Sequence, residues 1–187
     1  DNTALTLTAP ELGQLYNMEV IKVESADGAS SLTFGNETFT NNGQDLTIYT
    51  NDSGSGTTLV NAAAVSNGAI TVIVDNTAAT NDSIYGGSGD DVLVVGTNGM
   101  SATDVFNGNG GTDTISLVNS TDITAVIDFS LVTNVEQAIT SANSTGAVDL
   151  DLGAVASTDA EPATFLVDGS SVTTSTGTLK FNKSETE

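Results

Sequence analysis

The segment that decides the fold is Gly86-Gly87-Ser88-Gly89-Asp90-Asp91-Val92-Leu93. Its glycines permit a tight turn because they carry no Cβ atom and can adopt positive φ. Such a turn directs several backbone carbonyls toward one point, and Asp91 adds a carboxylate where the turn ends. Val92 leaves the turn as the start of a short strand, and Leu93 is expected to point into a core because strand side chains alternate. The segment therefore predicts a turn followed by a half-buried strand.

A nine-residue period extends this pattern along the chain. Asp82 stands nine residues before Asp91, and Asp104 stands nine before Asp113. The second pair ends in Gly108-Asn109-Gly110-Gly111-Thr112-Asp113-Thr114-Ile115. Self-similarity at a fixed short period is typical of solenoids, in which turns and strands alternate and two half-coils make one parallel coil. We expect the apolar residues of the same phase to form the core: Ile84, Leu93, Phe106 and Ile115.

The rest of the chain is also typical of strands and turns. Short runs rich in Val, Ile, Leu and Thr alternate with Gly, Asn, Asp and Ser clusters, as in residues 45–50 and 69–75. The fold class predicted is all-β: a parallel β-roll or β-solenoid with calcium-binding turns, the alternative being a β-sandwich with an embedded β-roll. One solenoid domain is expected over residues 1–187, with 81–118 as its nonapeptide segment. The short helical candidates are residues 10–16, 61–66 and 135–142.

A weaker repeat appears at an offset of 117 residues. Glu11-Leu12 and Asn17-Met18-Glu19 correspond to Asp128-Phe129 and Asn134-Val135-Glu136. Residues 25–35 and 141–153 continue the correspondence, with a short insertion. The repeat predicts similar coils near the start and the end of the chain. Glu19 and Glu136 are interpreted as exposed or hydrogen-bonding residues of these coils rather than as metal ligands.

The composition excludes several functions. The 187 residues include 24 Asp and Glu against 3 Lys and Arg, a net charge of −21, with no His and no Cys. Thiolate chemistry and His-dependent nucleophilic catalysis are therefore impossible. The negative field repels nucleic acid, and no apolar run approaches the ~20 residues that span a bilayer. Catalysis by Lys22, or by a carboxylate pair such as Asp149 and Asp151, is disfavoured against a solvent-exposed strand face, so we expect no enzyme.

The carboxylates instead predict Ca²⁺, a hard cation that takes 6–8 oxygen ligands. Turns 86–91 and 108–113 lie one coil apart, so they should stack on one edge and hold an ion between Asp91, Asp113 and backbone carbonyls of both turns. A second ion is expected on the opposite edge between Asp82 and Asp104, an edge that Asp122 could extend. The metal-site residues predicted are Asn81, Asp82, Gly86, Gly87, Ser88, Gly89, Asp90, Asp91, Asp104, Gly108, Asn109, Gly110, Gly111 and Asp113.

Residues 81–116 resemble the repeats-in-toxin family, also called hemolysin-type calcium-binding repeats. Residues 86–94 match its G-G-x-G-x-D-x-U-x pattern at every specified position, U being a large apolar residue, whereas Asn109 and Gly110 depart from it. The resemblance implies a parallel β-roll, folding driven by calcium and secretion into a calcium-rich exterior. The Asn-Met-Glu and Asn-Val-Glu segments also look like coils that flank such repeats in bacterial surface-layer proteins and large adhesins.

These observations predict a secreted structural protein of a bacterial surface, stabilised by calcium. Similar coils at its two ends predict head-to-tail assembly into a layer or filament, since a solenoid has open ends. The alternative is an adhesin module that binds a glycan, ice or another surface, or one segment among the neighbouring domains of a longer adhesin.

Overall fold

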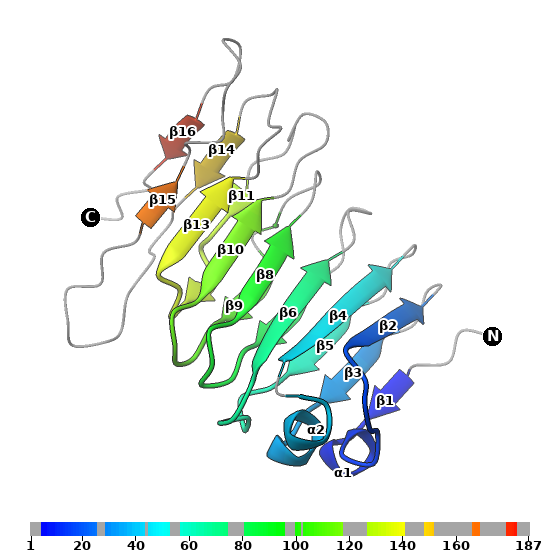
Figure 1. Cartoon of the computed structure of the whole chain (residues 1–187). Helices are drawn as coiled ribbons and strands as arrows, with labels where there is room; N and C mark the ends of the chain where they lie inside the picture. Colours follow the sequence, from blue (N-terminus) through cyan, green and yellow to red (C-terminus); the bar gives the residue numbers. More distant parts are fainter. Residues whose placement is uncertain are drawn as a thin grey trace.

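The chain winds as a β-solenoid in which parallel strands stack coil upon coil (Figure 1). It is seen in a computed structural model that describes residues 5–25, 29–43, 45–52, 57–74, 81–95, 100–101, 103–117, 127–140, 148–151, 166–168 and 179–182. Every strand pair found there is parallel. The prediction of a parallel β-roll is confirmed, and the described strands do not form the alternative, a β-sandwich with an embedded β-roll.

Three sheets are built from these strands. Sheet A contains, in spatial order, β1 (Leu5–Leu7), β3 (Ser30–Thr33), β5 (Thr58–Asn61), β7 (Ser83–Tyr85), β9 (Val105–Asn107) and β12 (Val132–Thr133). Sheet B contains β2 (Val20–Ser25), β4 (Asp45–Asp52), β6 (Ala69–Val74), β8 (Val92–Val95), β10 (Thr114–Leu117), β13 (Gln137–Thr140) and β15 (Leu166–Asp168). Sheet C contains β11 (Ile127–Asp128), β14 (Val148–Asp151) and β16 (Leu179–Asn182).

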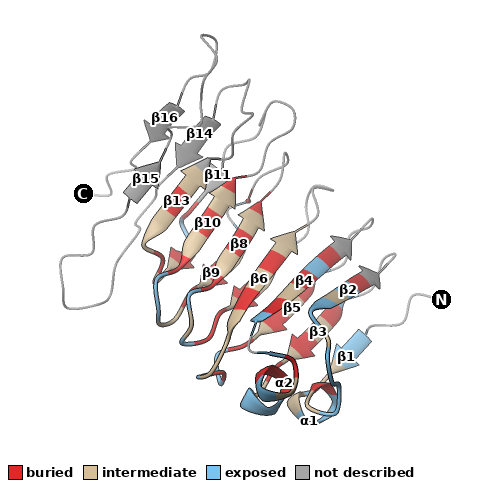
Figure 2. Cartoon of the chain, viewed as in Figure 1, coloured by how far each residue is buried: buried red, intermediate tan, exposed pale blue. Residues whose placement is uncertain are grey.

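The core consists of apolar columns that run along the stack between sheets A and B (Figure 2). Strand alternation puts every second side chain inward, as in β8, where Leu93 and Val95 are buried and Val92 and Val94 are only half-buried. Strand register then aligns these inward residues from coil to coil. One column comprises Leu32, Val60, Ile84, Phe106 and Val132, and the facing one comprises Ile48, Val72, Leu93, Ile115 and Ala138. The four apolar positions predicted as core are all among them.

The connections from sheet A to sheet B shorten along the chain. The first two, residues 8–19 and 34–44, include the helices α1 (Ala9–Leu12) and α2 (Asn36–Asn41). The next four are residues 62–68, 86–91, 108–113 and 134–136. In α2, Phe39 is fully buried and packs edge-on against Phe34, with ring centroids 6.0 Å apart. Bulky helical turns thus close this edge in the first coils, and the glycine turns follow on the same edge (Figure 1).

The helical expectations were met only in part. Helix α1 overlaps the first candidate segment, residues 10–16, but it begins one residue earlier, at Ala9, and ends at Leu12. Residues 61–66 are the end of β5 and a turn, and residues 135–142 include the strand β13. Helix α2 was not predicted, because Asn-Glu-Thr-Phe-Thr-Asn is poor in strong helix formers and the burial of Phe39 outweighs that local preference.

The 117-residue repeat is visible in the backbone. Asn17 and Asn134 both adopt the left-handed conformation, with φ of 55° and 52°. Each stands three residues before a sheet B strand, and the paired positions Leu12 and Phe129 are both buried in the core. The first coil and the coil of β12 and β13 therefore enter sheet B through the same kind of turn. No helix in the described part of the chain is long and apolar enough to cross a membrane.

Candidate metal centre

The two glycine turns stack on one edge of the solenoid, as their spacing predicts. β8 pairs with β10 so that Val92 lies beside Thr114, and the preceding residues Asp91 and Asp113 are therefore in register. Backbone bonds join the turns directly: the Gly86 N–H donates to the Asn107 carbonyl at 2.8 Å, and the Gly110 N–H donates to the Gly87 carbonyl at 3.1 Å. The stacking leaves both aspartates only 1% exposed.

These carboxylates form a ladder of hydrogen bonds between coils. Asp91 Oδ1 accepts the Ile70 N–H at 2.7 Å, and its Oδ2 accepts the Gly87 N–H at 2.6 Å. Asp113 Oδ1 accepts the Asp91 N–H at 2.7 Å, and Glu136 Oε2 accepts the Asp113 N–H at 2.7 Å. Each acidic side chain thus reaches back one coil and satisfies an N–H at the entrance of a sheet B strand. Glu136 has the hydrogen-bonding role that the sequence favoured for it.

One buried oxygen of the ladder has no partner within the described part of the chain. Asp113 Oδ2 is buried and makes no hydrogen bond to the described residues. It lies beside Gly108, where an added Cβ would overlap both Asp113 Oδ2 and the Asn134 carbonyl oxygen. The same arrangement occurs one coil earlier, where a Cβ on Gly86 would overlap Asp91 Oδ2 and come within 2.6 Å of the Gly108 carbonyl oxygen. The missing side chains therefore leave room for a carboxylate and a carbonyl oxygen to approach each other.

The reason for these glycines differs from the one expected. Positive φ in the described turns occurs at Asn109 and Gly111, with φ of 67° and 120°, but not at Gly86 or Gly108. At the latter two positions glycine is required by close packing of oxygen atoms rather than by backbone conformation. Asn109 occupies the left-handed position that this short polar residue tolerates, and its Nδ2 donates to the Gly86 carbonyl at 2.7 Å.

Burial raises the pKa of both ladder aspartates. The pKa of Asp91 rises to about 6, mainly because burial disfavours its charged form, although the N–H groups of Ile70 and Gly87 counteract this. The pKa of Asp113 rises to about 7 for the same reason, with the charges of Asp91 and Glu136 adding to the effect. Two buried carboxylates with no positive charge beside them among the described residues are an unfavourable arrangement that a cation would relieve.

The remaining residues predicted for this site lie at its margin. Asp90 is exposed, and its Oδ1 accepts the Thr112 N–H at 2.8 Å. Ser88 is exposed, and its N–H donates to the Val65 carbonyl at 3.0 Å. Gly89 fits closely against the backbone of Gly68, since an added Cβ would lie 2.5 Å from the Gly68 carbonyl oxygen. These three residues support the turn, and their described contacts join it to neighbouring coils.

The opposite edge carries a second carboxylate ladder. Asp82 Oδ1 accepts the Thr58 N–H at 2.9 Å, and Asp104 Oδ1 accepts the Asp82 N–H at 2.9 Å. Asp104 Oδ2 also accepts the Ser101 N–H at 2.7 Å, and Asn81 Oδ1 accepts the Thr103 hydroxyl. The structure thus brings Asp82 and Asp104 together as predicted. Both are half-buried, so this edge is more open to water than the first.

Asp122, which the sequence offers as an extension of this edge, lies outside the described residues. Val132 pairs with Phe106, so counting back two residues on each strand places Ser130 in line with Asp104. The coil that follows Asp104 is longer than the regular eighteen residues that the sequence argument assumed.

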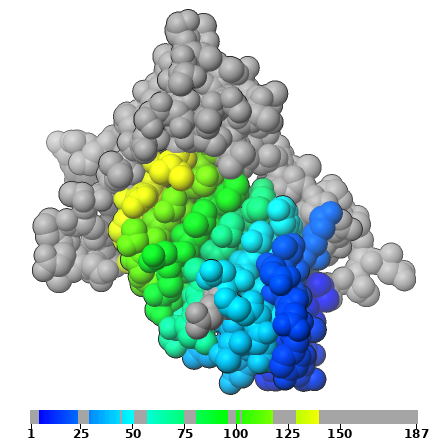
Figure 3. Space-filling view, in the orientation of Figure 1, coloured from blue at the N-terminus to red at the C-terminus, as the bar shows by residue number. Residues whose placement is uncertain are grey.

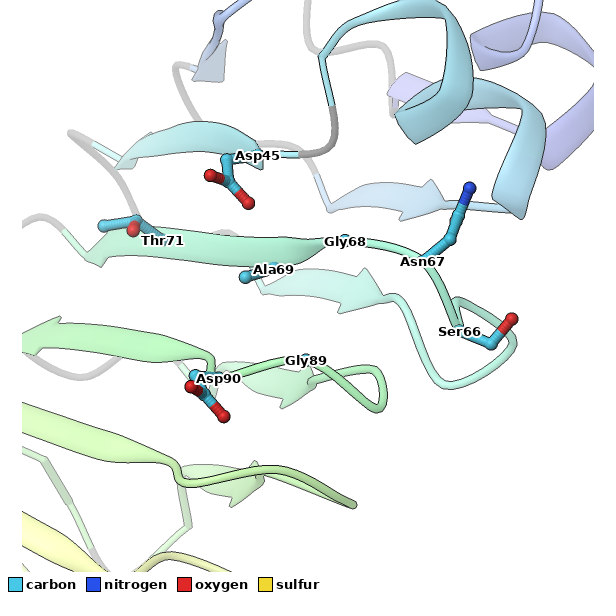
Figure 4. Close-up of a pocket in the computed structure, with 8 residues that line it drawn as sticks. All are labelled: Asp45, Ser66, Asn67, Gly68, Ala69, Thr71, Gly89 and Asp90. Carbon is cyan, nitrogen blue, oxygen red and sulfur yellow. The ribbon is translucent and has the colours of Figure 1, made fainter.

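A groove that the sequence did not indicate lies beside the first edge (Figure 4). It has a volume of about 570 Å³. Asp45 and Asp90 flank Ala69, to which Asp45 is paired in register, and the small residues Gly68, Ala69 and Gly89 leave the space between them open. A single turn with glycine is too common to predict a groove from the sequence. The groove becomes apparent only when residues of three stacked coils are seen together. Its lining residues are Asp45, Ser66, Asn67, Gly68, Ala69, Thr71, Gly89 and Asp90.

The donor set of the glycine turns is compatible with a hard cation. Its atoms are carboxylate and carbonyl oxygens, the ligands that Ca²⁺ prefers, and the unpartnered Asp113 Oδ2 is among them. Within the described residues no three acidic side chains converge as a metal-binding group, so an ion there would depend on backbone carbonyls as well as on Asp91 and Asp113. Comparison of the chain with protein-family models, with curated proteins and with solved structures gave no significant match.

Proposed function

We propose that this protein is a calcium-stabilised structural component of a bacterial exterior, which assembles into a surface layer or filament. The observation that supports the proposal best is the buried pair Asp91 and Asp113, in register on stacked turns, with Asp113 Oδ2 lacking a hydrogen-bond partner among the described residues. Burying an unpaired carboxylate is costly, and a bound cation removes that cost. The repeats-in-toxin resemblance of residues 81–116 points to calcium as that cation.

In this proposal Asp91, Asp113 and carbonyls of residues 86–89 and 108–111 would hold the ion. Calcium would supply positive charge to the stacked turns, and it would bind the folded coil rather than the unfolded chain. A ligand at 100 times its dissociation constant adds about 2.7 kcal/mol to the free energy of unfolding. That contribution is substantial for a domain whose stability is about 5–15 kcal/mol. With a net charge of −21, the chain would also repel itself less once cations are bound.

A second candidate function is glycan binding by an adhesin module, and the groove favours it. Carboxylates at Asp45 and Asp90, with the hydroxyls of Ser66 and Thr71, are groups that can hydrogen-bond sugar hydroxyls across an open surface. The groove could also accept other polar ligands. The groove is weaker evidence of function than the ladder. Asp45 and Asp90 are exposed, so water can hydrogen-bond their carboxylates without any ligand.

Circular dichroism and sedimentation velocity, first in EDTA and then in millimolar calcium, distinguish these functions. We expect calcium to increase the β-sheet signal and to shift sedimentation toward large species, with Asp113→Asn reducing the response and the exposed Asp45→Asn leaving it unchanged. A folded monomer in calcium would reject assembly and leave glycan binding as the leading function. No change in either signal would reject the calcium site itself.

A further inference from the structure

One side-chain contact joins the two glycine turns at a carbonyl of the proposed calcium site. Asn109 Nδ2, in turn 108–113, donates to the Gly86 carbonyl oxygen of turn 86–91 at 2.7 Å. Gly86 is buried and Asn109 is half-buried. Figure 3 shows the described coils following one another in sequence order from blue to yellow, and the two turns belong to neighbouring coils. The contact therefore lies at the boundary where the ion would be held.

The direction of this hydrogen bond follows from its partner. A backbone carbonyl oxygen can only accept a hydrogen bond, so the amide nitrogen of Asn109 faces Gly86, and its amide oxygen does not. Other oxygen atoms lie nearby, since a Cβ on Gly86 would meet Asp91 Oδ2 and the Gly108 carbonyl oxygen. The partly positive amide hydrogens of Asn109 are thus placed in a region rich in oxygen atoms, as a cation would be.

The backbone holds Asn109 in this position. Its φ is 67°, in the left-handed region that glycine and asparagine tolerate, and its N–H donates to Asn107 Oδ1 at 3.0 Å. The register of the two coils places Gly87 at the corresponding position of the first turn. Asparagine therefore keeps the backbone that glycine would adopt at position 109 and adds an amide that reaches the preceding turn.

We propose that Asn109 competes with calcium for the Gly86 carbonyl oxygen and thereby lowers the calcium affinity of the site. In the absence of calcium its amide links the two turns, and it releases Gly86 when that oxygen becomes a ligand. A carbonyl oxygen has two lone pairs, but the positive charges of an ion and of the amide hydrogens repel each other across one atom. The inference rests on the proposed calcium site and names the residue that tunes it.

Asn109→Gly tests the competition because it keeps the left-handed backbone and removes the amide. In EDTA, loss of the hydrogen bond should lower the melting temperature by about 2–4 °C, measured by circular dichroism. In saturating calcium the variant and the unmodified chain should melt at the same temperature, because Asn109 has released Gly86 in both conditions of the comparison. Isothermal titration calorimetry should show calcium binding about fivefold more tightly to the variant.

Asn109→Asp keeps the shape of the side chain and replaces the amide donor by a carboxylate. In EDTA it should melt below Asn109→Gly, because a carboxylate oxygen then faces the Gly86 carbonyl oxygen. Calcium should raise its melting temperature the most, because the carboxylate can supply a further oxygen ligand. If either variant is unfolded in EDTA, its melting temperature in saturating calcium decides: a value equal to that of the unmodified chain supports competition, and a lower value contradicts it.

Asn17→Gly is the matched control for the backbone. It makes the same substitution at another left-handed asparagine, with φ of 55°, whose side chain is exposed in the first coil. Its calcium affinity should equal that of the unmodified chain.

The inference and the proposed function fail in different ways. If Asn109→Gly lowers the melting temperature equally in EDTA and in calcium, with unchanged or weaker calcium binding, Asn109 only supports the turn. The inference is then wrong while the calcium site stands. If calcium neither binds nor stabilises the unmodified chain or any variant, the proposed function is wrong as well.

Discussion

Gly108→Ala is expected to destabilise the protein strongly, by about 3 kcal/mol, the upper end of the usual cost of overpacking. The added Cβ would overlap Asp113 Oδ2 and the Asn134 carbonyl oxygen. The second obstacle is backbone, so the clash cannot be relieved by rotating a side chain. For a chain of this size each kcal/mol lowers the melting temperature by about 2–4 °C. Thermal unfolding followed by circular dichroism, with and without calcium, measures the effect.

The matched control for this substitution is Gly110→Ala in the same turn. A Cβ at Gly110 would meet only Ser88, at 3.8 Å and 4.0 Å, and the φ of Gly110 is not positive. Its stability should change little or rise slightly, since alanine reduces the freedom of the unfolded chain. Gly108→Ala should also weaken the calcium response, because the Cβ occupies the space beside the ladder oxygens. Equal melting temperatures for the two variants would contradict the packing described for this turn.

In calcium-free buffer the folded protein is expected to lose stability as pH rises from about 4 to 7. The pKa of Asp91 is raised to about 6 and that of Asp113 to about 7, from an ordinary value of 3.8. Within this window the folded state holds protons that the unfolded state has released, so increasing pH favours unfolding. Saturating calcium should abolish or reverse the trend, because the ion binds the ionised carboxylates. Urea unfolding at several pH values measures the slope.

The variant Asp113→Asn isolates the ladder from the general charge of the chain. Asparagine keeps an acceptor for the Asp91 N–H but does not titrate, so the slope between about pH 5.5 and 7.5 should become smaller. Moderate salt in every sample screens repulsion among surface carboxylates. The exposed control Asp45→Asn should retain the slope. Stability that rises with pH in the absence of calcium, or a slope that is undiminished in Asp113→Asn, would contradict the raised pKa of Asp113.

The structure of the nonapeptide segment could be predicted because its nine-residue period determines how its turns and strands stack. Asp91 and Asp113 each stand nine residues after another aspartate, and each is followed two residues later by an apolar residue. Because this spacing repeats, it predicts that the turns stack and that the apolar side chains form one inward-facing column. The register of Val92 beside Thr114 and the burial of Leu93 and Ile115 follow from that spacing. The placement of Asp82 beside Asp104 follows from it as well.

Other features depend on contacts between coils that no local pattern contains. The helix α2 exists because Phe39 is buried against Phe34, and the groove exists because Gly68 and Gly89 stack beside each other. The step from Phe106 to Val132 is longer than a regular coil and puts Ser130 in line with Asp104, and an irregular connection of this kind leaves no periodic signal.

The central claim is that an ion is held between the two glycine turns, and a crystal structure of the calcium-loaded protein tests it most directly. Anomalous scattering identifies calcium independently of the coordinates. We predict a peak between turns 86–91 and 108–113, with oxygen ligands from Asp91 and Asp113 at about 2.3–2.6 Å, and no such peak in Asp113→Asn. A calcium-loaded crystal with no peak between these turns, and with Asp113 Oδ2 still lacking a partner, would contradict the account.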